Sequence, residues 1–252
     1  MLSNRLDGKV AIITGASQGL GFDMARAFAT QGVRLVITGR HQDKLDERAE
    51  VLRAQGAEVL AVAGDVGQRR TADDTVARTL EAFGRVDVLI NNAQTISLPV
   101  PLIEQDDAHM QAIIGSGLFG TMYFMQAAYP ALRREGGAII NFGSGQGVVG
   151  GAGTASYAAA KEGIRGLSRV AAREWGKDKI RVNVICPGAW SPSYENWFKD
   201  KPEELAATFA AKPLGRPADG FEDLGRLALF LASPDCFLTG QTMFIDGGVI
   251  ML

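Results

Sequence analysis

Short apolar runs alternate with amphipathic stretches along most of the chain. Seven runs have the composition of strands buried on both faces, and they span residues 9–14, 33–38, 57–62, 86–90, 137–142, 180–186 and 242–245. Between them, apolar residues recur at helical spacing over residues 19–31, 42–55, 69–84, 106–134, 154–177, 203–211 and 219–232. This alternation predicts an α/β fold, a mostly parallel seven-stranded sheet with helices on both faces.

No repeat, low-complexity segment or linker divides the 252 residues, so we expect a single domain over residues 1–252. In open parallel sheets, ligands bind beyond the carboxyl ends of the strands. Asn91, Ser144 and Pro187 each follow or end a strand-like run, as does the glycine-rich segment after residue 14. We therefore expect all of these on one rim of the sheet.

Composition and charge remove several classes of partner. The chain has 26 Lys and Arg residues, 28 Asp and Glu residues, a net charge of −2 and no basic run, which speaks against nucleic acid and anionic membranes. No apolar run approaches the ~20 residues of a membrane span, and no signal-peptide pattern opens the chain. Cys186 and Cys236 do not suggest a disulfide framework, and no Cys, His and Asp spacing suggests a metal site. We expect a cytoplasmic protein.

A glycine-rich turn joins the first predicted strand to the first predicted helix. Its sequence is Gly-Ala-Ser-Gln-Gly-Leu-Gly, from Gly15 to Gly21. Glycines let the backbone approach a pyrophosphate closely, and the N-terminus of the helix adds free N–H groups. The alternative is a tight strand–helix turn without a ligand. Three glycines at a helix start lower stability without evident packing gain, which favours the ligand.

Tyr157 and Lys161 are four residues apart in a predicted helix, and Ser144 ends the preceding strand-like run. Residues at that helical spacing lie on one face. A lysine about 4 Å from the phenol would favour tyrosinate by up to roughly 4 kcal/mol, or about 3 pKa units. Tyr157 would then exchange a proton with a carbonyl or hydroxyl oxygen, and Ser144 would donate a hydrogen bond to the same oxygen. Taken alone, such a pair is common on solvated helices.

In combination, these motifs resemble the single-domain short-chain dehydrogenases/reductases over essentially the whole chain. The matching pieces are Thr14-Gly15-x-x-x-Gly19-x-Gly21, Asp65-Val66, Asn91-Asn92-Ala93, Ser144, Tyr157-x-x-x-Lys161, Pro187-Gly188 and Asp246-Gly247-Gly248. The resemblance implies a Rossmann-type doubly wound sheet and reversible hydride transfer between a nicotinamide cofactor and a carbonyl or alcohol. It also implies a homotetramer built through the helices at residues 106–134 and 154–177.

The same resemblance assigns roles to residues. Tyr157 is expected as the acid/base, Lys161 as the residue that holds the nicotinamide ribose and lowers the phenol's pKa, and Ser144 as the group that orients the substrate oxygen. Asp65 and Val66 are expected at the adenine pocket. The full set of expected cofactor-binding residues is Gly15, Ser17, Gln18, Gly19, Leu20, Gly21, Arg40, Asp65, Val66, Asn91, Ala93, Tyr157, Lys161, Pro187 and Gly188.

The end of the second predicted strand bears on the choice of cofactor. An acidic residue there would bind the ribose hydroxyls of NAD, but this chain has Gly39 followed by Arg40. Arg40 could pair with the 2′-phosphate of NADP through charge-assisted hydrogen bonds. A solvated arginine at a helix start is the alternative, and Gln18 adds no second positive charge in the glycine turn. We favour NADP(H) over NAD(H).

Three departures from the family pattern involve four positions. Gly117 stands where many relatives have an asparagine that joins a water-linked proton path to the lysine. Gln94 stands where Asn-Asn-Ala is usually followed by glycine, and a larger polar side chain there is expected at the mouth of the site. Trp190 and Pro192 replace the usual aliphatic residue and threonine, so the threonine's contact to the nicotinamide amide is expected to be missing.

Substrate residues are expected in a lid at about residues 190–212 and around the mouth of the site. Trp190, Tyr194, Trp197 and Phe198 could line an apolar pocket, although residues 194, 197 and 198 also follow the spacing of an ordinary helix core. Gln94 and Gln146 are further candidates.

Three readings of function remain open. The first is an NADPH-dependent ketone reductase with an apolar or aromatic substrate. The second is an NAD-dependent dehydrogenase of a sugar- or polyol-like alcohol. The third is a non-catalytic dinucleotide-binding protein, which would have no evident need for both Ser144 and the phenol of Tyr157.

Overall fold

The computed structural model describes residues 6–96, 99–190 and 198–251, and it centres on one seven-stranded parallel sheet. The strand order is β3-β2-β1-β4-β5-β6-β7. The strands are β1 (Val10–Thr14), β2 (Arg34–Gly39), β3 (Val59–Ala63), β4 (Val88–Asn91), β5 (Gly137–Phe142), β6 (Ile180–Pro187) and β7 (Thr242–Ile245). The order reverses between β1 and β4, which in such sheets creates the crevice where a dinucleotide binds.

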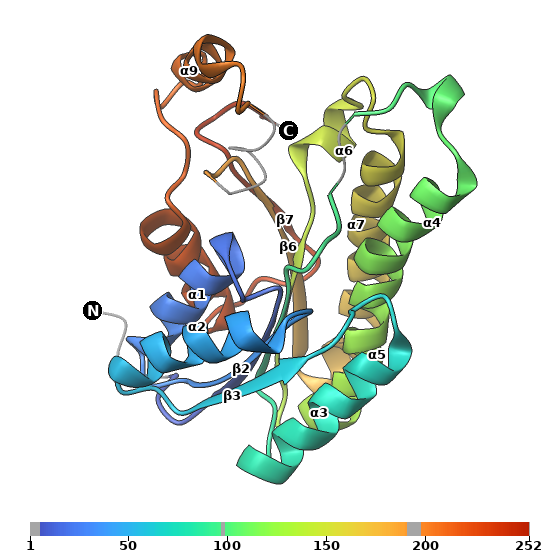
Figure 1. Ribbon diagram of the computed structural model, residues 1–252. Helices are drawn as coiled ribbons and strands as arrows, with labels where there is room; N and C mark the ends of the chain where they lie inside the picture. The colour runs from blue at the N-terminus through green and yellow to red at the C-terminus, as the bar shows by residue number, and fades with distance from the viewer. Residues whose placement is uncertain (1–5, 97–98, 191–197, 252) are drawn as a thin grey trace.

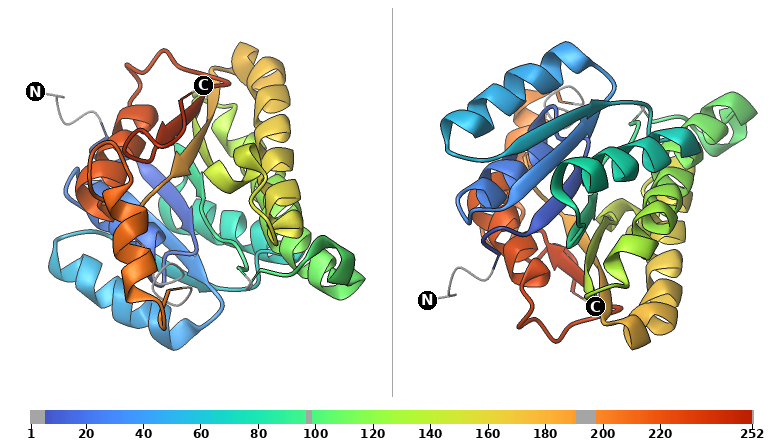
Figure 2. Two further views of the ribbon diagram at one scale, coloured as in Figure 1. Left: turned by 90° about the horizontal axis from the view of Figure 1, so that it is seen from above. Right: turned by 90° about the horizontal axis from the view of Figure 1, so that it is seen from below.

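Helices cover both faces of the sheet (Figures 1 and 2). One apolar core includes residues of α1 (Gly19–Ala29), α2 (Gln42–Ala54), the π-helical segment η4 (Gly220–Gly225) and α10 (Arg226–Ala232). The other core includes residues of α3 (Arg69–Phe83), α5 (Gly120–Leu132) and α7 (Ala155–Trp175). The remaining elements are η1 (Leu102–Glu104), α4 (Asp107–Ile114), η2 (Gly115–Phe119), α6 (Gly145–Val149), η3 (Gly176–Asp178) and α9 (Pro202–Ala210). Within the described parts of the chain, no helix is long and apolar enough to cross a membrane.

The predicted fold class is confirmed, and each predicted strand lies within two residues of an observed one. The predicted long helix 106–134 is wrong in one respect, because it is interrupted by the π-helical segment η2. Two of its glycines allow close contacts there. A Cβ on Gly117 would lie 2.2 Å from Oε1 of Gln94, and one on Gly120 would lie 2.9 Å from the carbonyl oxygen of Val66. The short helices η1 and α6 were not predicted.

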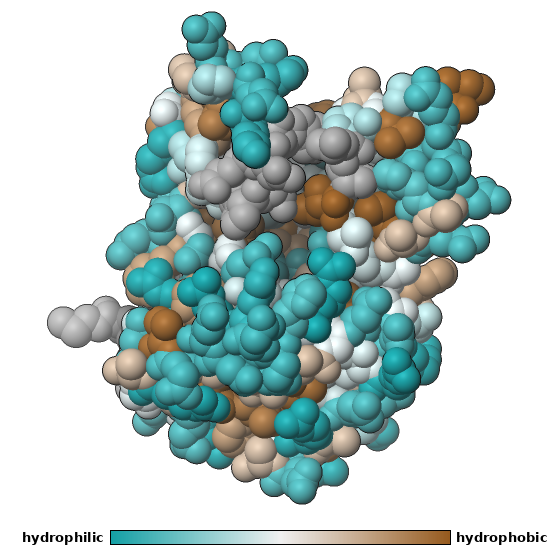
Figure 3. Space-filling model, viewed as in Figure 1, coloured by the Kyte–Doolittle hydropathy of each residue, from teal (hydrophilic) through white to brown (hydrophobic). Residues whose placement is uncertain are grey.

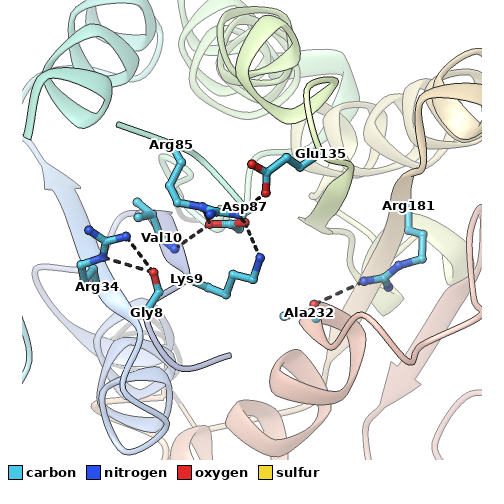
Figure 4. A network of polar contacts seen from close by, with 9 residues as sticks. All are labelled: Gly8, Lys9, Val10, Arg34, Arg85, Asp87, Glu135, Arg181 and Ala232. Carbon is cyan, nitrogen blue, oxygen red and sulfur yellow. Dashed lines mark hydrogen bonds and ion pairs between the residues drawn. The ribbon is translucent and has the colours of Figure 1, made fainter. Parts of the chain in front are cut away.

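A charged cluster ties together the amino-terminal edge of the sheet (Figure 4). The carboxylate of Asp87 accepts hydrogen bonds from Arg85 at 2.7 and 2.6 Å, from the Val10 N–H at 3.0 Å and from Lys9 at 3.1 Å. Arg85 also reaches Glu135 at 2.7 Å. Burial raises the pKa of Asp87, but the hydrogen bonds from Arg85, Val10 and Lys9 together hold it below its ordinary value. This cluster lies at the opposite edge from the residues described next.

Candidate active site

The carboxyl ends of the strands meet at one edge of the sheet, where the surface is hollowed between the α9 side and the α4–α6 side (Figure 3). Apolar atoms are visible inside this hollow. Asn91 ends β4, and Ser144 lies two residues beyond the end of β5. Pro187 ends β6, and the glycine turn follows β1. The fold therefore brings the sequence-predicted motifs to one rim.

The glycine turn requires its glycines. Gly15 and Gly19 have positive φ angles of 70° and 55°, a backbone conformation that residues other than glycine rarely adopt. A Cβ on Gly21 would lie 2.5 Å from the carbonyl oxygen of Gly15, so helix α1 packs directly on the turn. The N-cap residue Gln18 makes no side-chain cap hydrogen bond. The backbone N–H groups of the first turn are thus left for a ligand, and this cradle fits the pyrophosphate of a dinucleotide.

A second loop is fastened to this turn by side chains. The hydroxyl of Thr14 accepts the N–H groups of Asn92 and Ala93, both at 3.0 Å. The amide of Asn92 donates to the carbonyl oxygens of Thr14 at 3.0 Å and Gly15 at 3.3 Å. Asn92 is the middle residue of the Asn91-Asn92-Ala93 motif, and the family resemblance predicts no role for it. Its role in the structure is to hold the loop after β4 against the loop after β1.

Positive charge surrounds the end of β2. Arg40 is exposed, and no hydrogen bond or ion pair of its side chain is found within the described residues. The side chain of Arg48 on α2 donates to the carbonyl oxygen of Ser17 at 3.3 Å and lies over the ring of Phe22. A Cβ on Gly39 would lie 3.1 Å from Oγ of Ser17. Arg48 therefore contacts Ser17, and Arg40 follows the glycine that faces it. Sequence reasoning missed Arg48 because it is 31 residues away from Ser17 in the chain.

Asp65 and Val66 follow β3. The exposed carboxylate of Asp65 accepts the N–H of Gly67 at 2.9 Å. Val66 is buried, and its carbonyl group lies against Gly120 at the start of α5. The loop after β3 thus lies beside the first turn of α5, at the same edge of the sheet as the glycine turn.

Ser144 lies near Tyr157 and lowers the pKa of its phenol. Ser144 is the N-cap of α6, and its hydroxyl accepts the N–H of Gln146 at 3.1 Å, which fixes its orientation. Burial raises the pKa of Tyr157 and the hydroxyl of Ser144 lowers it, with a net upward direction. The expected lowering of the Tyr157 pKa by Lys161 is therefore wrong for the ligand-free protein, because burial outweighs it and the ammonium nitrogen lies 5.5 Å from the ring centre. The phenol keeps its proton and can donate it.

Lys161 is buried one helical turn beyond Tyr157. Its ammonium nitrogen donates to the carbonyl oxygen of Phe142 at 2.9 Å and lies 5.5 Å from the centre of the Tyr157 ring. Burial lowers the pKa of Lys161 to about 8, while the nearby Cys186 acts in the other direction. Burial raises the pKa of Cys186 to about 11, so this residue is a neutral thiol beneath the lysine.

A buried chain of amides supports the same region. The amide of Asn91 donates to Asn141 at 2.8 Å, and Asn141 in turn donates to Ser168 on α7 at 2.8 Å. Ser168 donates to the carbonyl oxygen of Ile164 at 2.6 Å. These hydrogen bonds fix α7, and with it Tyr157 and Lys161, against the ends of β4 and β5.

A second buried lysine, Lys212, follows α9 and lies against the loop after β6. Lys212 donates to the carbonyl oxygen of Asp246 at 3.0 Å, and a Cβ on Gly188 would lie 2.9 Å from its ammonium nitrogen. The carboxylate of Asp246 accepts the N–H groups of Gly248, Val249 and Ile250. Gly188 is thereby packed against the turn after β7, and Pro187 and Gly188 lie at the rim where they were expected.

The expected substrate residues that the structure describes make contacts in different parts of the molecule. The ring of Trp190 lies 5.4 Å from that of Phe209 on α9, measured between ring centres. The amide oxygen of Gln146 lies over Gly151. Gln94 directs its amide into the helical region at Ile113 and Gly117. Tyr194 and Trp197 lie outside the described residues.

Comparison with known proteins finds a matching family model and similar enzymes. The family model described as enoyl-(acyl carrier protein) reductase matches residues 15–250. The chain is 45% identical over 251 residues to a 12alpha-hydroxysteroid dehydrogenase of a Clostridium species, covering 96% of this chain and 97% of that protein. It is 35% identical over 254 residues to the trans-4-hydroxycyclohexanecarboxylate dehydrogenase of Sinomonas cyclohexanicum, covering 98% of this chain and 95% of that protein.

Solved structures share the fold closely. The L-sorbose reductase of Gluconobacter frateurii, in complex with NADPH and L-sorbose, superposes with a TM-score of 0.91 at 30% identity, covering 98% of each chain. Levodione reductase also gives a TM-score of 0.91, at 27% identity, and covers 96% of this chain and 98% of its own.

Proposed function

Because the chain belongs to the short-chain dehydrogenase/reductase family and is an NAD(P)-dependent oxidoreductase, we propose that it is an NADP(H)-dependent ketone reductase, equivalently a secondary-alcohol dehydrogenase. The observation that carries this proposal is the cluster of Ser144, Tyr157 and Lys161 at the rim that also holds the glycine turn. A non-catalytic dinucleotide-binding protein is set aside, since the relatives are dehydrogenases and reductases.

In the proposed reaction, Ser144 and Tyr157 bind the carbonyl oxygen of the substrate. When bound, the reduced nicotinamide supplies the hydride that adds to the carbonyl carbon. The phenol of Tyr157 gives its proton to the oxygen as negative charge develops there, and Ser144 stabilises that charge through its hydroxyl. The ammonium group of Lys161 favours the resulting tyrosinate electrostatically.

The cofactor would lie along the rim. Its pyrophosphate fits the turn from Gly15 to Gly21, and Asp65 and Val66 would border the adenine. Asn91, Ala93, Pro187 and Gly188 would line the path to the nicotinamide. Lys161 would also hold the nicotinamide ribose.

Arg40 and Arg48 support the choice of NADP(H). Arg48 contacts Ser17, and the exposed Arg40 follows the last residue of β2, where the 2′-phosphate of an adenine ribose would lie. Gly39 leaves room at this point, and it brings no carboxylate that would repel the phosphate. The NADPH complex of the L-sorbose reductase is consistent with this choice.

For the substrate, we propose a bulky apolar ring ketone. The names of the relatives include a 12alpha-hydroxysteroid and a hydroxycyclohexanecarboxylate. Trp190, which packs on Phe209 of α9, would line the pocket from a lid at about residues 190–212, together with Tyr194 and Trp197. Gln146 would lie at the mouth. A sugar or polyol used with NAD is the second candidate, because the L-sorbose reductase has a similar fold and binds a sugar.

We also propose a cytoplasmic homotetramer assembled through α4, α5 and α7. The apolar stripe of α7 does not carry this proposal, because Ala160, Ile164 and Ala171 are already buried within one chain. Phe119 at the end of η2 and Val170 on α7 remain exposed and would lie near such an interface. Light scattering at micromolar concentration tests the assembly, and a monomeric mass would reject it.

The function is tested by following reduced nicotinamide with a panel of steroid ketones, substituted cyclohexanones and ketoses. We expect turnover with NADPH on at least one ring ketone. Tyr157→Phe should abolish turnover because the phenol supplies the proton, while cofactor affinity stays within about twofold because the glycine turn and Lys161 remain. The matched control is Tyr123→Phe on α5, which should behave as the parent. No turnover by the parent on any substrate would reject the proposal.

A further inference from the structure

The chain after β7 returns to the rim of the sheet between α9 and α6 (Figure 1). It begins with Asp246, whose carboxylate accepts the N–H groups of Gly248 at 2.9 Å, Val249 at 3.1 Å and Ile250 at 2.9 Å. Three hydrogen bonds to one carboxylate close this segment into a compact turn. The backbone at Ile250 is therefore fixed, so a substitution at position 250 changes a side chain and leaves the course of the chain intact.

This turn touches the loops after both β5 and β6. A Cβ on Gly188, in the loop after β6, would lie 2.6 Å from Cα and Cβ of Asp246. A Cβ on Gly145, in the segment after β5, would lie 2.6 Å from Cδ1 of Ile250. The ammonium group of Lys212 donates to the carbonyl oxygen of Asp246 at 3.0 Å, which fastens the turn from the α9 side. The turn thus bridges two loops at the rim and is held in place from three directions.

The side chain of Ile250 lies beside the serine that is proposed to bind the substrate oxygen. Gly145 is the first residue of α6 and directly follows Ser144. Because position 145 has no side chain, the isoleucine occupies the space that a side chain there would take. Ile250 is half-buried, whereas the neighbouring Val249 is 55% exposed. The isoleucine therefore packs inward on α6, and the valine faces outward.

We propose that Ile250 is a specificity-determining residue, which limits the size of the substituents that a ketone carries next to its carbonyl carbon. This inference rests on the proposed ketone reduction. In that reaction Ser144 and Tyr157 bind the carbonyl oxygen, and the carbons attached to the carbonyl carbon are only two bonds from this oxygen. On the Ser144 side, those carbons meet the branched, apolar side chain of Ile250.

The chemistry of such a wall sets the expected size of the effect. An aliphatic side chain offers no hydrogen bond, so it discriminates by volume alone. One methyl group more or less in an apolar pocket changes kcat/KM by roughly 10- to 200-fold. A single branched residue at this place is therefore sufficient to decide between ketones that differ only next to the carbonyl group.

The test compares 2-methylcyclohexanone with 4-methylcyclohexanone, isomers that differ only in the position of the methyl group relative to the carbonyl group. The ratio of their kcat/KM values is independent of the concentration of active enzyme, so a partly folded variant does not change it. Ile250→Ala should raise kcat/KM for the 2-methyl isomer relative to the 4-methyl isomer by about tenfold. Ile250→Phe should lower the same ratio by a similar factor. Val249→Ala shortens the exposed neighbour in the same turn, and as the matched control it should keep the parental ratio.

The outcomes separate this inference from the proposed function. A parent that reduces no ketone rejects the function and this inference with it. An active parent whose ratio is unchanged in Ile250→Ala and Ile250→Phe rejects the inference alone. If either variant does not fold, Ile250→Val should shift the ratio in the direction of Ile250→Ala, and an unchanged ratio there overturns the proposal.

A crystal structure of the parent with oxidised NADP and the ketone that it reduces best gives a readout independent of turnover. We expect the side chain of Ile250 within about 4.5 Å of a carbon attached to the carbonyl carbon, or of a substituent on that carbon. A wider gap would also overturn the proposal.

Discussion

The ammonium nitrogen of Lys161 is held 2.9 Å from the carbonyl oxygen of Phe142, one residue beyond the point where β4 stops pairing with β5. Because β4 ends at Asn91, the carbonyl group of Phe142 on β5 has no partner on β4, and it accepts a hydrogen bond from Lys161 instead. The geometry keeps a positive charge near Tyr157 at the expense of desolvating that charge. Function and stability are therefore expected to conflict at this residue.

Replacing Lys161 with Met is expected to abolish turnover and yet to stabilise the cofactor-free protein at pH 7. The lysine pKa is about 8 when folded, against about 10.4 when unfolded. The unfolded chain binds more protons between these values, so the stability of the parent rises through this interval and is lowest below it. Removing the buried charge should raise the free energy of unfolding at pH 7 by on the order of 3 kcal/mol. Leaving the Phe142 carbonyl group unpaired should lower it by roughly 1–2 kcal/mol.

Thermal unfolding at pH 7 and at about pH 10 measures this effect. The advantage of Lys161→Met over the parent should shrink at the higher pH, where the folded parent has lost the proton. A variant that is less stable than the parent at pH 7 would contradict the expected cost of burying the charge.

Arg40 and Arg48 are expected to set the preference for NADPH. Replacing Arg40 with Ala should lower kcat/KM for NADPH by about 10- to 100-fold, the value of one charge-assisted hydrogen bond to a phosphate, and leave kcat/KM for NADH within about threefold. Arg48→Ala should act in the same direction but less strongly, because part of its guanidinium is engaged by Ser17. The control is Arg53→Ala on the same helix. An unchanged ratio of NADPH to NADH efficiency in the double variant would exclude this role.

Gly21→Ala should damage both folding and cofactor binding. The added methyl group would lie 2.5 Å from the carbonyl oxygen of Gly15 and 2.6 Å from the amide of Asn92, so the turn or the helix must move. We expect a loss of about 1–3 kcal/mol in unfolding free energy, as for other overpacked sites. Cofactor Kd, followed by nicotinamide fluorescence, should increase. Gly166→Ala on α7 adds a methyl group to open space, and it should keep parental affinity.

Asp87 is expected to support stability at neutral pH but not in acid. Its pKa is below the ordinary value in the folded protein, so its contribution is complete above the unfolded pKa near ~3.9 and is lost as pH falls through the folded value. Asp87→Asn should cost about 2 kcal/mol at pH 7, a typical value for hydrogen bonds to a buried carboxylate. Denaturant unfolding measured as a function of pH tests this. The unfolding free energies of the parent and of Asp87→Asn should approach each other as the pH falls. Glu135→Gln, which changes an exposed partner, should alter stability by less than about 1 kcal/mol.

The sequence was sufficient for the sheet and for the residues at its rim. Apolar runs specify parallel strands directly, and Ser144, Tyr157 and Lys161 come from elements adjacent in space. The break at η2 was not foreseen, since helical periodicity continues through Gly115–Phe119. Beside this break the amide of Gln94, from the loop after β4, donates to the carbonyl oxygen of Ile113. Arg48 and Asn92 were missed as functional candidates for the same reason: each acts on a residue of another loop.

The position of β1 has a consequence for biosynthesis. This strand is the first to leave the ribosome, yet it pairs with both β2 and β4, and the Val10–Asp87 hydrogen bond spans 77 residues. A nascent chain that ends before β4 leaves one edge of β1 unpaired and forms only one side of the crevice. Such long-range pairing slows folding, and an unpaired strand edge favours aggregation until β4 has been made.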